Sequence, residues 1–106
     1  MEKIYYDSYE KRIRTTVWAE KISDGSVKIH KYVRGIYVDD IGGLDETDTV
    51  LTVHEESLQK LFSEAHVPSV KDLFVFFTQF ACCREGYEHI RSWIDHAVTE
   101  YEEETV

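Results

Sequence analysis

The sequence contains no long apolar run, which excludes one large class of proteins. A helix needs about 18 to 20 consecutive apolar residues to cross a bilayer, and no stretch of the 106 residues approaches that length. The chain opens with Met1-Glu2-Lys3 and then has Tyr5, Tyr6 and Asp7, where a secreted protein would carry an apolar segment. We therefore expect a cytoplasmic protein that makes no contact with a membrane.

Cysteine is also scarce. The only two cysteines, Cys82 and Cys83, are neighbours, and a bridge between adjacent residues would close a strained ring. A disulfide framework is therefore excluded, which fits a reducing compartment. Because nothing nearby in the sequence supplies a base at a useful spacing, we interpret both thiols as small core residues and not as nucleophiles.

The motifs of common active sites are missing as well. The sequence has no glycine-rich phosphate loop, no Gly-x-Ser-x-Gly and no His-Glu-x-x-His. Its five histidines are scattered, and no two of them have the spacing of three to five residues that is typical of zinc sites. We therefore expect no catalytic residues, no cofactor, no metal and no enzymatic activity.

One acidic segment invites comparison with a metal site. Tyr37-Val38-Asp39-Asp40 resembles, over four residues, the metal-binding turn of reverse-transcriptase palm domains, which would imply Mg²⁺ on two adjacent carboxylates. Such a palm needs a further aspartate on a separate strand and a much longer chain. The residues that follow add carboxylates, but without the spacing of a calcium loop. We interpret the segment as a strand that runs into a solvated acidic loop.

Positive charge is in short supply and unevenly distributed. The chain carries 12 Lys and Arg against 21 Asp and Glu, a formal net charge of −9. Duplex nucleic acid is therefore an unfavourable partner, because its binding depends on Lys and Arg that displace counterions from phosphates. Residues 1–43 sum to +1 and residues 44–106 to −10. This split indicates that the acidic part meets a protein partner with a basic surface.

The N-terminal part of the chain predicts β-structure. Residues 12–22 alternate with a period of two, which is typical of a strand, and Ser23-Asp24-Gly25-Ser26 predicts the turn of a hairpin. The returning strand changes phase at Gly35, which indicates a β-bulge. Lys3–Tyr6 predicts a further short strand that ends in a turn at Asp7-Ser8, so that a three-stranded meander results.

A loop and the first helices are predicted next. Residues 39–48, with two glycines at their centre, predict the one clear loop, and Thr49–Val53 predicts a fourth strand. Capping boxes at Thr52-x-x-Glu55 and Ser69-x-x-Asp72 predict the starts of two helices. The first of these helices ends near Pro68.

The remaining residues predict two further elements and complete the fold class. The helix over residues 70–82 carries four phenylalanines and is apolar nearly all round, so we expect it in the core or in a homodimer seam. A third helix covers about 85–101, and residues 102–104 form a frayed acidic tail. The order predicts one α+β domain over residues 1–106: an N-terminal antiparallel β-meander of three or four strands, followed by three helices packed on one face.

One face of the predicted hairpin collects the residue types that dominate binding hot spots, namely Trp, Tyr and Arg. The alternatives are a second core face under the helices, or a stack of Trp18 on Tyr32 that only stabilises the sheet. We combine this face with the acidic loop as the predicted partner-binding residues, which are Arg14, Trp18, His30, Tyr32, Arg34, Asp39, Asp40, Asp45, Glu46 and Asp48.

The functional expectation follows from size, charge and the missing motifs. In these respects the chain resembles small acidic inhibitors encoded by phages and mobile elements, such as anti-CRISPR and anti-restriction proteins, and equally immunity proteins for nuclease toxins. We expect an interaction protein that neutralises a macromolecular partner by stoichiometric occlusion, for example a protein with a nucleic-acid-binding groove. The alternative is a small-ligand or nucleotide-binding protein, or a small enzyme, that uses the hairpin face.

Overall fold

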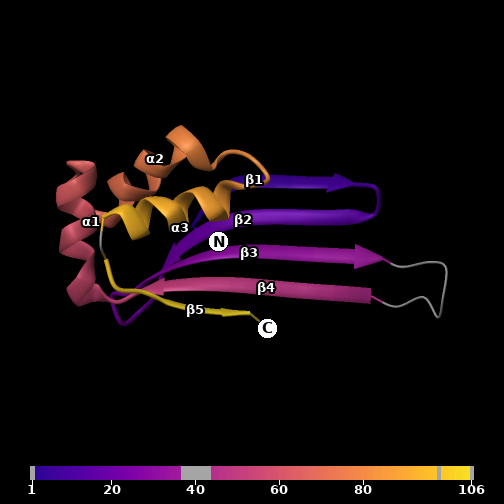
Figure 1. The fold of residues 1–106 in the computed structure, drawn as a ribbon, viewed down its shortest axis with the longest axis horizontal. Helices are drawn as coiled ribbons and strands as arrows, with labels where there is room; N and C mark the ends of the chain where they lie inside the picture. The colour runs from indigo at the N-terminus through magenta and orange to yellow at the C-terminus, as the bar shows by residue number, and fades with distance from the viewer. Residues whose placement is uncertain (1, 37–43, 98, 106) are drawn as a thin grey trace.

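The computed structural model describes residues 2–36, 44–97 and 99–105. An antiparallel sheet with the strand order β1-β2-β3-β4-β5 lies against three helices (Figure 1). Along the chain the elements are β1 (Lys3–Glu10), β2 (Ile13–Lys21), β3 (Val27–Ile36), β4 (Leu44–Val53), the 3-10 turn η1 (Glu55–Ser57), α1 (Leu58–Ala65), α2 (Val70–Ala81), α3 (Gly86–His96) and β5 (Glu102–Thr105). The predicted α+β class, with four strands before three helices, is confirmed.

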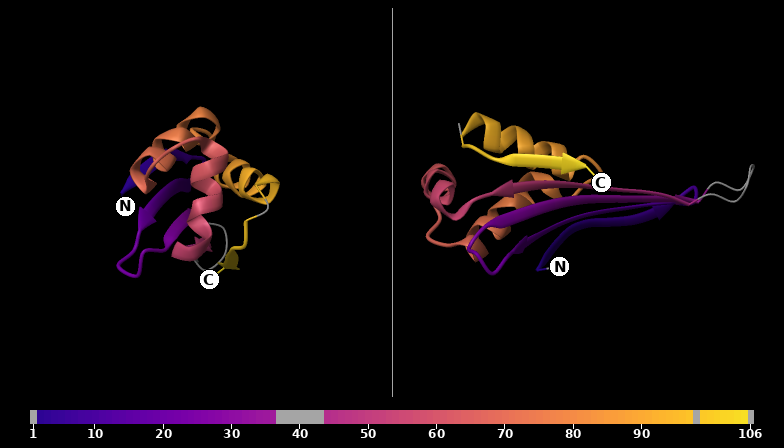
Figure 2. Two further views of the ribbon diagram at one scale, coloured as in Figure 1. Left: turned by 90° about the vertical axis from the view of Figure 1, so that its left-hand side faces the viewer. Right: turned by 90° about the horizontal axis from the view of Figure 1, so that it is seen from below.

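All three helices lie on the same side of the sheet (Figure 2). Most of the strand residues that face them are apolar and buried, and Val17 and Ala19 of β2 and Ile29 of β3 are at most 1% exposed. Lys31 of β3 is an exception and forms an ion pair with Glu88 of α3. The helices cover only one end of the sheet, and β1 to β4 extend beyond them (Figure 1). Within the described residues, no helix is long and apolar enough to cross a membrane.

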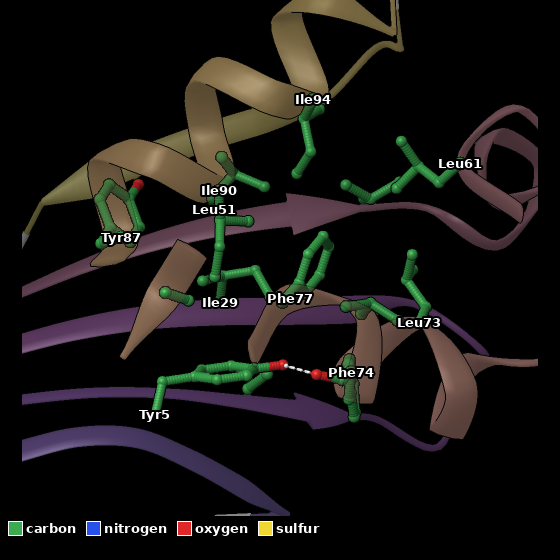
Figure 3. Packing of buried hydrophobic residues seen from close by; sticks show 14 of the residues in the cluster. Tyr5, Ile29, Leu51, Leu61, Leu73, Phe74, Phe77, Tyr87, Ile90 and Ile94 are labelled. Atoms are coloured by element: carbon green, nitrogen blue, oxygen red, sulfur yellow. Dashed lines mark hydrogen bonds between the residues drawn. The ribbon is translucent and has the colours of Figure 1, made fainter. Parts of the chain in front are cut away.

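One hydrophobic cluster joins the sheet to the helices (Figure 3). Phe77 of α2 lies at its centre and packs edge-on against the ring of Tyr5 of β1, with 6.3 Å between the ring centroids. The Tyr5 hydroxyl donates a hydrogen bond of 2.8 Å to the backbone oxygen of Phe74, so its polar atom is satisfied inside the core. Burial raises the pKa of this hydroxyl far above its usual range.

Two predictions for the N-terminal strands are wrong. Asp7 and Ser8 do not form a turn but continue β1, and the turn lies at Lys11 and Arg12, whose φ angles are +50° and +65°. The bulge lies in β1, where the register with β2 shifts between Ile4 and Tyr6. Gly35, where the bulge was predicted, takes part in regular pairing with both β2 and β4.

The predicted loop over residues 39–48 is also wrong in its second half. β4 begins at Leu44, so Glu46 and Asp48 lie in a strand opposite Arg34 and Tyr32. β3 pairs with β2 along one edge, and β4 pairs with its other edge over the whole of Val27–Ile36. Without residues 44–48, half of that second edge would lack a backbone hydrogen-bonding partner in the sheet. Asp39 and Asp40, with the rest of the palm-like segment, lie outside the described residues.

The two predicted capping boxes differ in their outcome. The Ser69 box is confirmed, because the Ser69 hydroxyl accepts a hydrogen bond from the Asp72 backbone nitrogen at 3.3 Å and donates one to Asp72 Oδ2 at 2.9 Å. The Thr52 box is wrong, because Thr52 belongs to β4 and pairs with Glu102. Strand pairing therefore overrides the local capping signal at this position.

The C-terminal residues form a strand instead of a frayed tail. Helix α3 ends at His96, earlier than predicted, and β5 then pairs with β4. Glu103 is held by Arg91, with 3.1 Å between the guanidinium and the carboxylate, and it accepts a hydrogen bond from the Tyr87 hydroxyl. These contacts reach back to α3 and explain why a run of glutamates adopts an ordered structure.

Helix α2 is less enclosed than its composition predicts. Phe77 is buried and Phe76 and Phe80 are partly buried around the Trp93 ring of α3, so the expectation that Phe76 and Phe77 are not both exposed is confirmed. Val75, in contrast, is 57% exposed. One side of the helix therefore faces outward.

Substitutions on the buried and on the exposed side of α2 should differ in their effect on stability. We expect Phe77→Ala to lower the free energy of unfolding by about 3 to 5 kcal/mol, because it leaves a cavity beneath the sheet. The matched change Val75→Ala on the exposed side should stay within about 0.5 kcal/mol. Urea unfolding followed by circular dichroism measures both, and equal losses would contradict this assignment of the core.

Candidate functional site

None of the described helices covers the second side of the sheet, and we call this side the helix-free face (Figure 2). Successive residues of a strand point to opposite sides, so the neighbours of the buried core residues lie on this face. Strand pairing aligns Trp18 with His30, Thr16 with Tyr32, and Tyr32 in turn with Asp48. From β1 to β5, the helix-free face carries Ile4, Asp7, Tyr9, Arg14, Thr16, Trp18, Glu20, Lys28, His30, Tyr32, Arg34, Glu46, Asp48, Val50, Thr52, Glu102 and Glu104.

A stacked pair of rings lies at the centre of this face. The Trp18 indole and the His30 imidazole are nearly parallel, with an interplanar angle of 3° and 3.7 Å between their centroids. The sequence suggested Tyr32 as the stacking partner of Trp18, but the strand register places Tyr32 opposite Thr16. His30 is only 7% exposed although no described helix covers it, because the indole lies against its ring.

His30 stands between two carboxylates. Its Nε2 lies 2.9 Å from Glu20 Oε2, and its Nδ1 lies 3.3 Å from Asp48 Oδ1. A protonated imidazole donates a hydrogen bond to both carboxylates, whereas a neutral ring has one N–H and can donate to only one. The geometry therefore ties β2, β3 and β4 together and fixes the orientation of the ring behind Trp18.

A second polar cluster lies toward the end of the sheet beyond the helices. Arg14 donates to Asp7 through two hydrogen bonds, Nε to Oδ1 at 3.1 Å and Nη2 to Oδ2 at 3.0 Å. The Thr16 hydroxyl donates to the same carboxylate at 3.1 Å. The Arg14 hydrogen bond is the main reason that the pKa of Asp7 is lowered, and Thr16 contributes to it.

The ring of Tyr32 lies between these two clusters. Desolvation raises the pKa of its hydroxyl, and a hydrogen bond to Glu46 raises it further. Glu46 also lies 3.7 Å from the Arg34 guanidinium. Arg14 and Arg34, the two arginines of this face, each have an acidic neighbour on an adjacent strand.

A hollow of about 260 Å³ lies among these side chains, and it is named simply the hollow. Trp18 and Tyr32 give it aromatic walls, while Thr16, Arg14 and Asp48 complete its lining. His30 is not part of the lining, in agreement with its place behind the indole. The hollow therefore combines two ring surfaces with one carboxylate and one guanidinium that is already engaged by Asp7.

The acidic part of the chain and the hairpin share this face. The strands β4 and β5 contribute four carboxylates to it, from Glu46, Asp48, Glu102 and Glu104. With Asp7 and Glu20, the described residues of the face hold six carboxylates, against the three fixed cations of Arg14, Lys28 and Arg34. The helix-free face is therefore acidic overall, although the hairpin alone is not.

The structure brings together seven of the ten predicted partner-binding residues, which are Arg14, Trp18, His30, Tyr32, Arg34, Glu46 and Asp48. Asp45 lies in β4, where its backbone pairs with Gly35, and Asp39 and Asp40 lie outside the described residues. Sequence reasoning missed Glu20 and Asp7 as members of the site. The alternation along β2 places Glu20 on the same face as Trp18, so the sequence contains a signal for it. Asp7 was missed because the sequence analysis assigned it to a turn and not to a strand.

Other reactive side chains lie away from this face. Cys82 is exposed and Cys83 partly so, which corrects the prediction that both fill the core. His89 Nδ1 lies 3.7 Å from Cys83 Sγ, but it also lies 2.8 Å from the backbone oxygen of Phe80 and donates its proton there, so this nitrogen is engaged. Among residues 2–36, 44–97 and 99–105, no three His, Cys, Asp or Glu side chains are grouped closely enough to hold a metal ion.

Comparison of the chain with protein-family models, with curated proteins and with solved structures found no match.

The stack of Trp18 on His30 should be measurable as an energetic coupling. In a double-mutant cycle of Trp18→Ala and His30→Ala, we expect the double variant to lose about 0.5 to 1.5 kcal/mol less than the sum of the single losses, because the stack can be removed only once. Urea unfolding of the four proteins gives the coupling. A parallel cycle of Trp18→Ala with the distant Val75→Ala should be additive, and additivity in both cycles would contradict the stack.

Proposed function

We propose that the protein is a small binding protein that neutralises a macromolecular partner by stoichiometric occlusion, and that it docks through the helix-free face. The observation that carries this proposal is the presentation of Trp18 and Tyr32 beside a hollow on the helix-free face. No described helix covers this side of the sheet (Figure 2). Trp and Tyr bury a large area at low entropic cost, and they are the residues on which binding energy most often depends.

Charge supports a partner with a basic surface. The six carboxylates of the face outnumber its three fixed cations, so the face attracts positive charge and steers a basic partner toward it. A partner protein that itself binds nucleic acid would present a basic surface of this kind. The acidic part of the chain and the hairpin face, which were separate candidates in the sequence, thereby contribute to a single proposed interface.

The side chains of the face are held in place before any partner arrives. His30 fixes one side of the Trp18 indole, and Asp7 fixes the Arg14 guanidinium with two hydrogen bonds. Binding then costs less rotamer entropy than it would with free side chains. This pre-organisation supports a role in recognition beyond the stability of the sheet.

The size of the hollow favours a side chain of a macromolecule over a free nucleotide. Pockets for drug-sized ligands typically enclose about 300 to 1,000 Å³, whereas the hollow has about 260 Å³ and is open to solvent. A nucleotide would find few enclosing contacts there. We therefore place the small-ligand alternative second.

Affinity capture tests the proposal. Immobilised wild-type protein should retain a partner from a lysate of its native host, and retention should fall at least about thirtyfold for Trp18→Ala, as expected for a hot spot of about 2 kcal/mol. Val75→Ala, on the exposed side of α2, is the matched control and should retain the partner fully. Native mass spectrometry of the eluate should give a fixed stoichiometry.

Two outcomes would contradict the proposal. The first is a partner that Trp18→Ala and Tyr32→Ala both retain fully while their melting temperatures show folded protein, because binding then uses another surface. The second is a small molecule that co-purifies with the wild type and is absent from the Trp18 variant, which would favour the ligand-binding alternative.

A further inference from the structure

We propose that the hollow receives an arginine side chain of the partner protein. This inference rests on the proposed function, because it names the chemical group by which the partner would be recognised. It uses three features of the hollow: its aromatic walls, the free oxygen of Asp48 and the engaged state of Arg14.

The aromatic walls suit a planar cation. Trp18 and Tyr32 are diagonal neighbours on β2 and β3, and both line the hollow. A guanidinium is flat and weakly hydrated, so it stacks on aromatic rings at a lower desolvation cost than an ammonium group. The walls alone therefore favour arginine over lysine.

Asp48 supplies the negative charge. Its Oδ1 faces His30 Nδ1 at 3.3 Å, and among the described residues the structure records no donor that forms a hydrogen bond to its Oδ2. The side chain is 37% exposed, so this oxygen can accept a hydrogen bond from an incoming donor. The rigid fork of a guanidinium can donate to this oxygen while its plane stays against a ring.

Arg14 also lines the hollow, and a guanidinium by itself would attract an anionic ligand. Its guanidinium is engaged by Asp7 through two hydrogen bonds, and that carboxylate would repel an incoming anion. Together with Asp48, the two carboxylates outweigh the one guanidinium by a single negative charge. The hollow therefore favours a cation over a phosphate or a carboxylate.

An NMR titration of the full chain tests this inference. The probes are the capped tripeptide acetyl-Gly-Arg-Gly-amide, its lysine and citrulline counterparts, inorganic phosphate and AMP. We expect the arginine peptide to shift the indole N–H signal of Trp18 in a saturable manner, and the uncharged citrulline peptide to bind at least about fivefold more weakly. The indole of Trp93, which packs among the phenylalanines of α2, serves as an internal reference and should not move.

Variants locate the binding site of the peptide. Asp48→Asn, which keeps the shape and an acceptor oxygen, should weaken the arginine peptide about fivefold. Tyr32→Ala should weaken it at least about fivefold, because the ring provides the stacking surface. The matched control Val75→Ala, on the exposed side of α2, should leave affinity within about twofold. Unchanged melting temperatures would show that these effects are local.

Several results would overturn the inference. It fails if phosphate or AMP shifts Trp18 more strongly than the arginine peptide does, or if Asp48→Asn leaves the peptide affinity unchanged. The experiments distinguish an error in the assignment of arginine binding to the hollow from an error in the proposed function. A captured partner that requires Trp18 but is indifferent to Asp48→Asn contradicts the arginine site alone, whereas arginine binding in the hollow with a partner indifferent to Trp18 contradicts the proposed interface.

Discussion

The register of β2 against β3 is the constraint on which the other features depend. Ala19 lies opposite Ile29 on one face, and Trp18 lies opposite His30 on the other. Because side chains alternate with a period of two, a slip by one residue would exchange the two faces. The helices can then pack only where the apolar set lies, and all three lie on that side of the sheet (Figure 2). The ring pair of Trp18 and His30 remains on the other side.

Hydrogen bonds between charged side chains order much of the helix-free face, whereas hydrophobic burial stabilises the core. An acidic chain tends to repel itself, and β4 and β5 bring further carboxylates onto a sheet that already holds Asp7 and Glu20. His30 lies between two carboxylates of this face. Arg14 donates hydrogen bonds to both oxygens of a third carboxylate. These pairs order the face but leave an excess of negative charge, which is the feature that the proposed recognition of a basic partner uses.

The sequence predicts the fold class and most of the site because both follow from short-range periodicity. Alternation in residues 12–22 places Trp18 and Arg14 on one face, and the Ser69 box marks the start of α2 correctly. Most of what sequence reasoning missed depends on pairing between elements. β5 is a strand because it pairs with β4, and its Glu103 also meets Tyr87 and Arg91 of α3. Asp7 stays extended because its partners lie on β2, so neither could be recognised from the residues next to it in the sequence.

The central claim is that the partner docks on the helix-free face. Cross-saturation NMR tests it most directly, with deuterated protein in complex with the protonated partner obtained by capture. The account predicts signal loss at the Trp18 indole and at the backbone amides of Tyr32 and Val50, and none at Val75 or elsewhere on the outer side of α2. Loss on the helices with an unaffected Trp18 would contradict it.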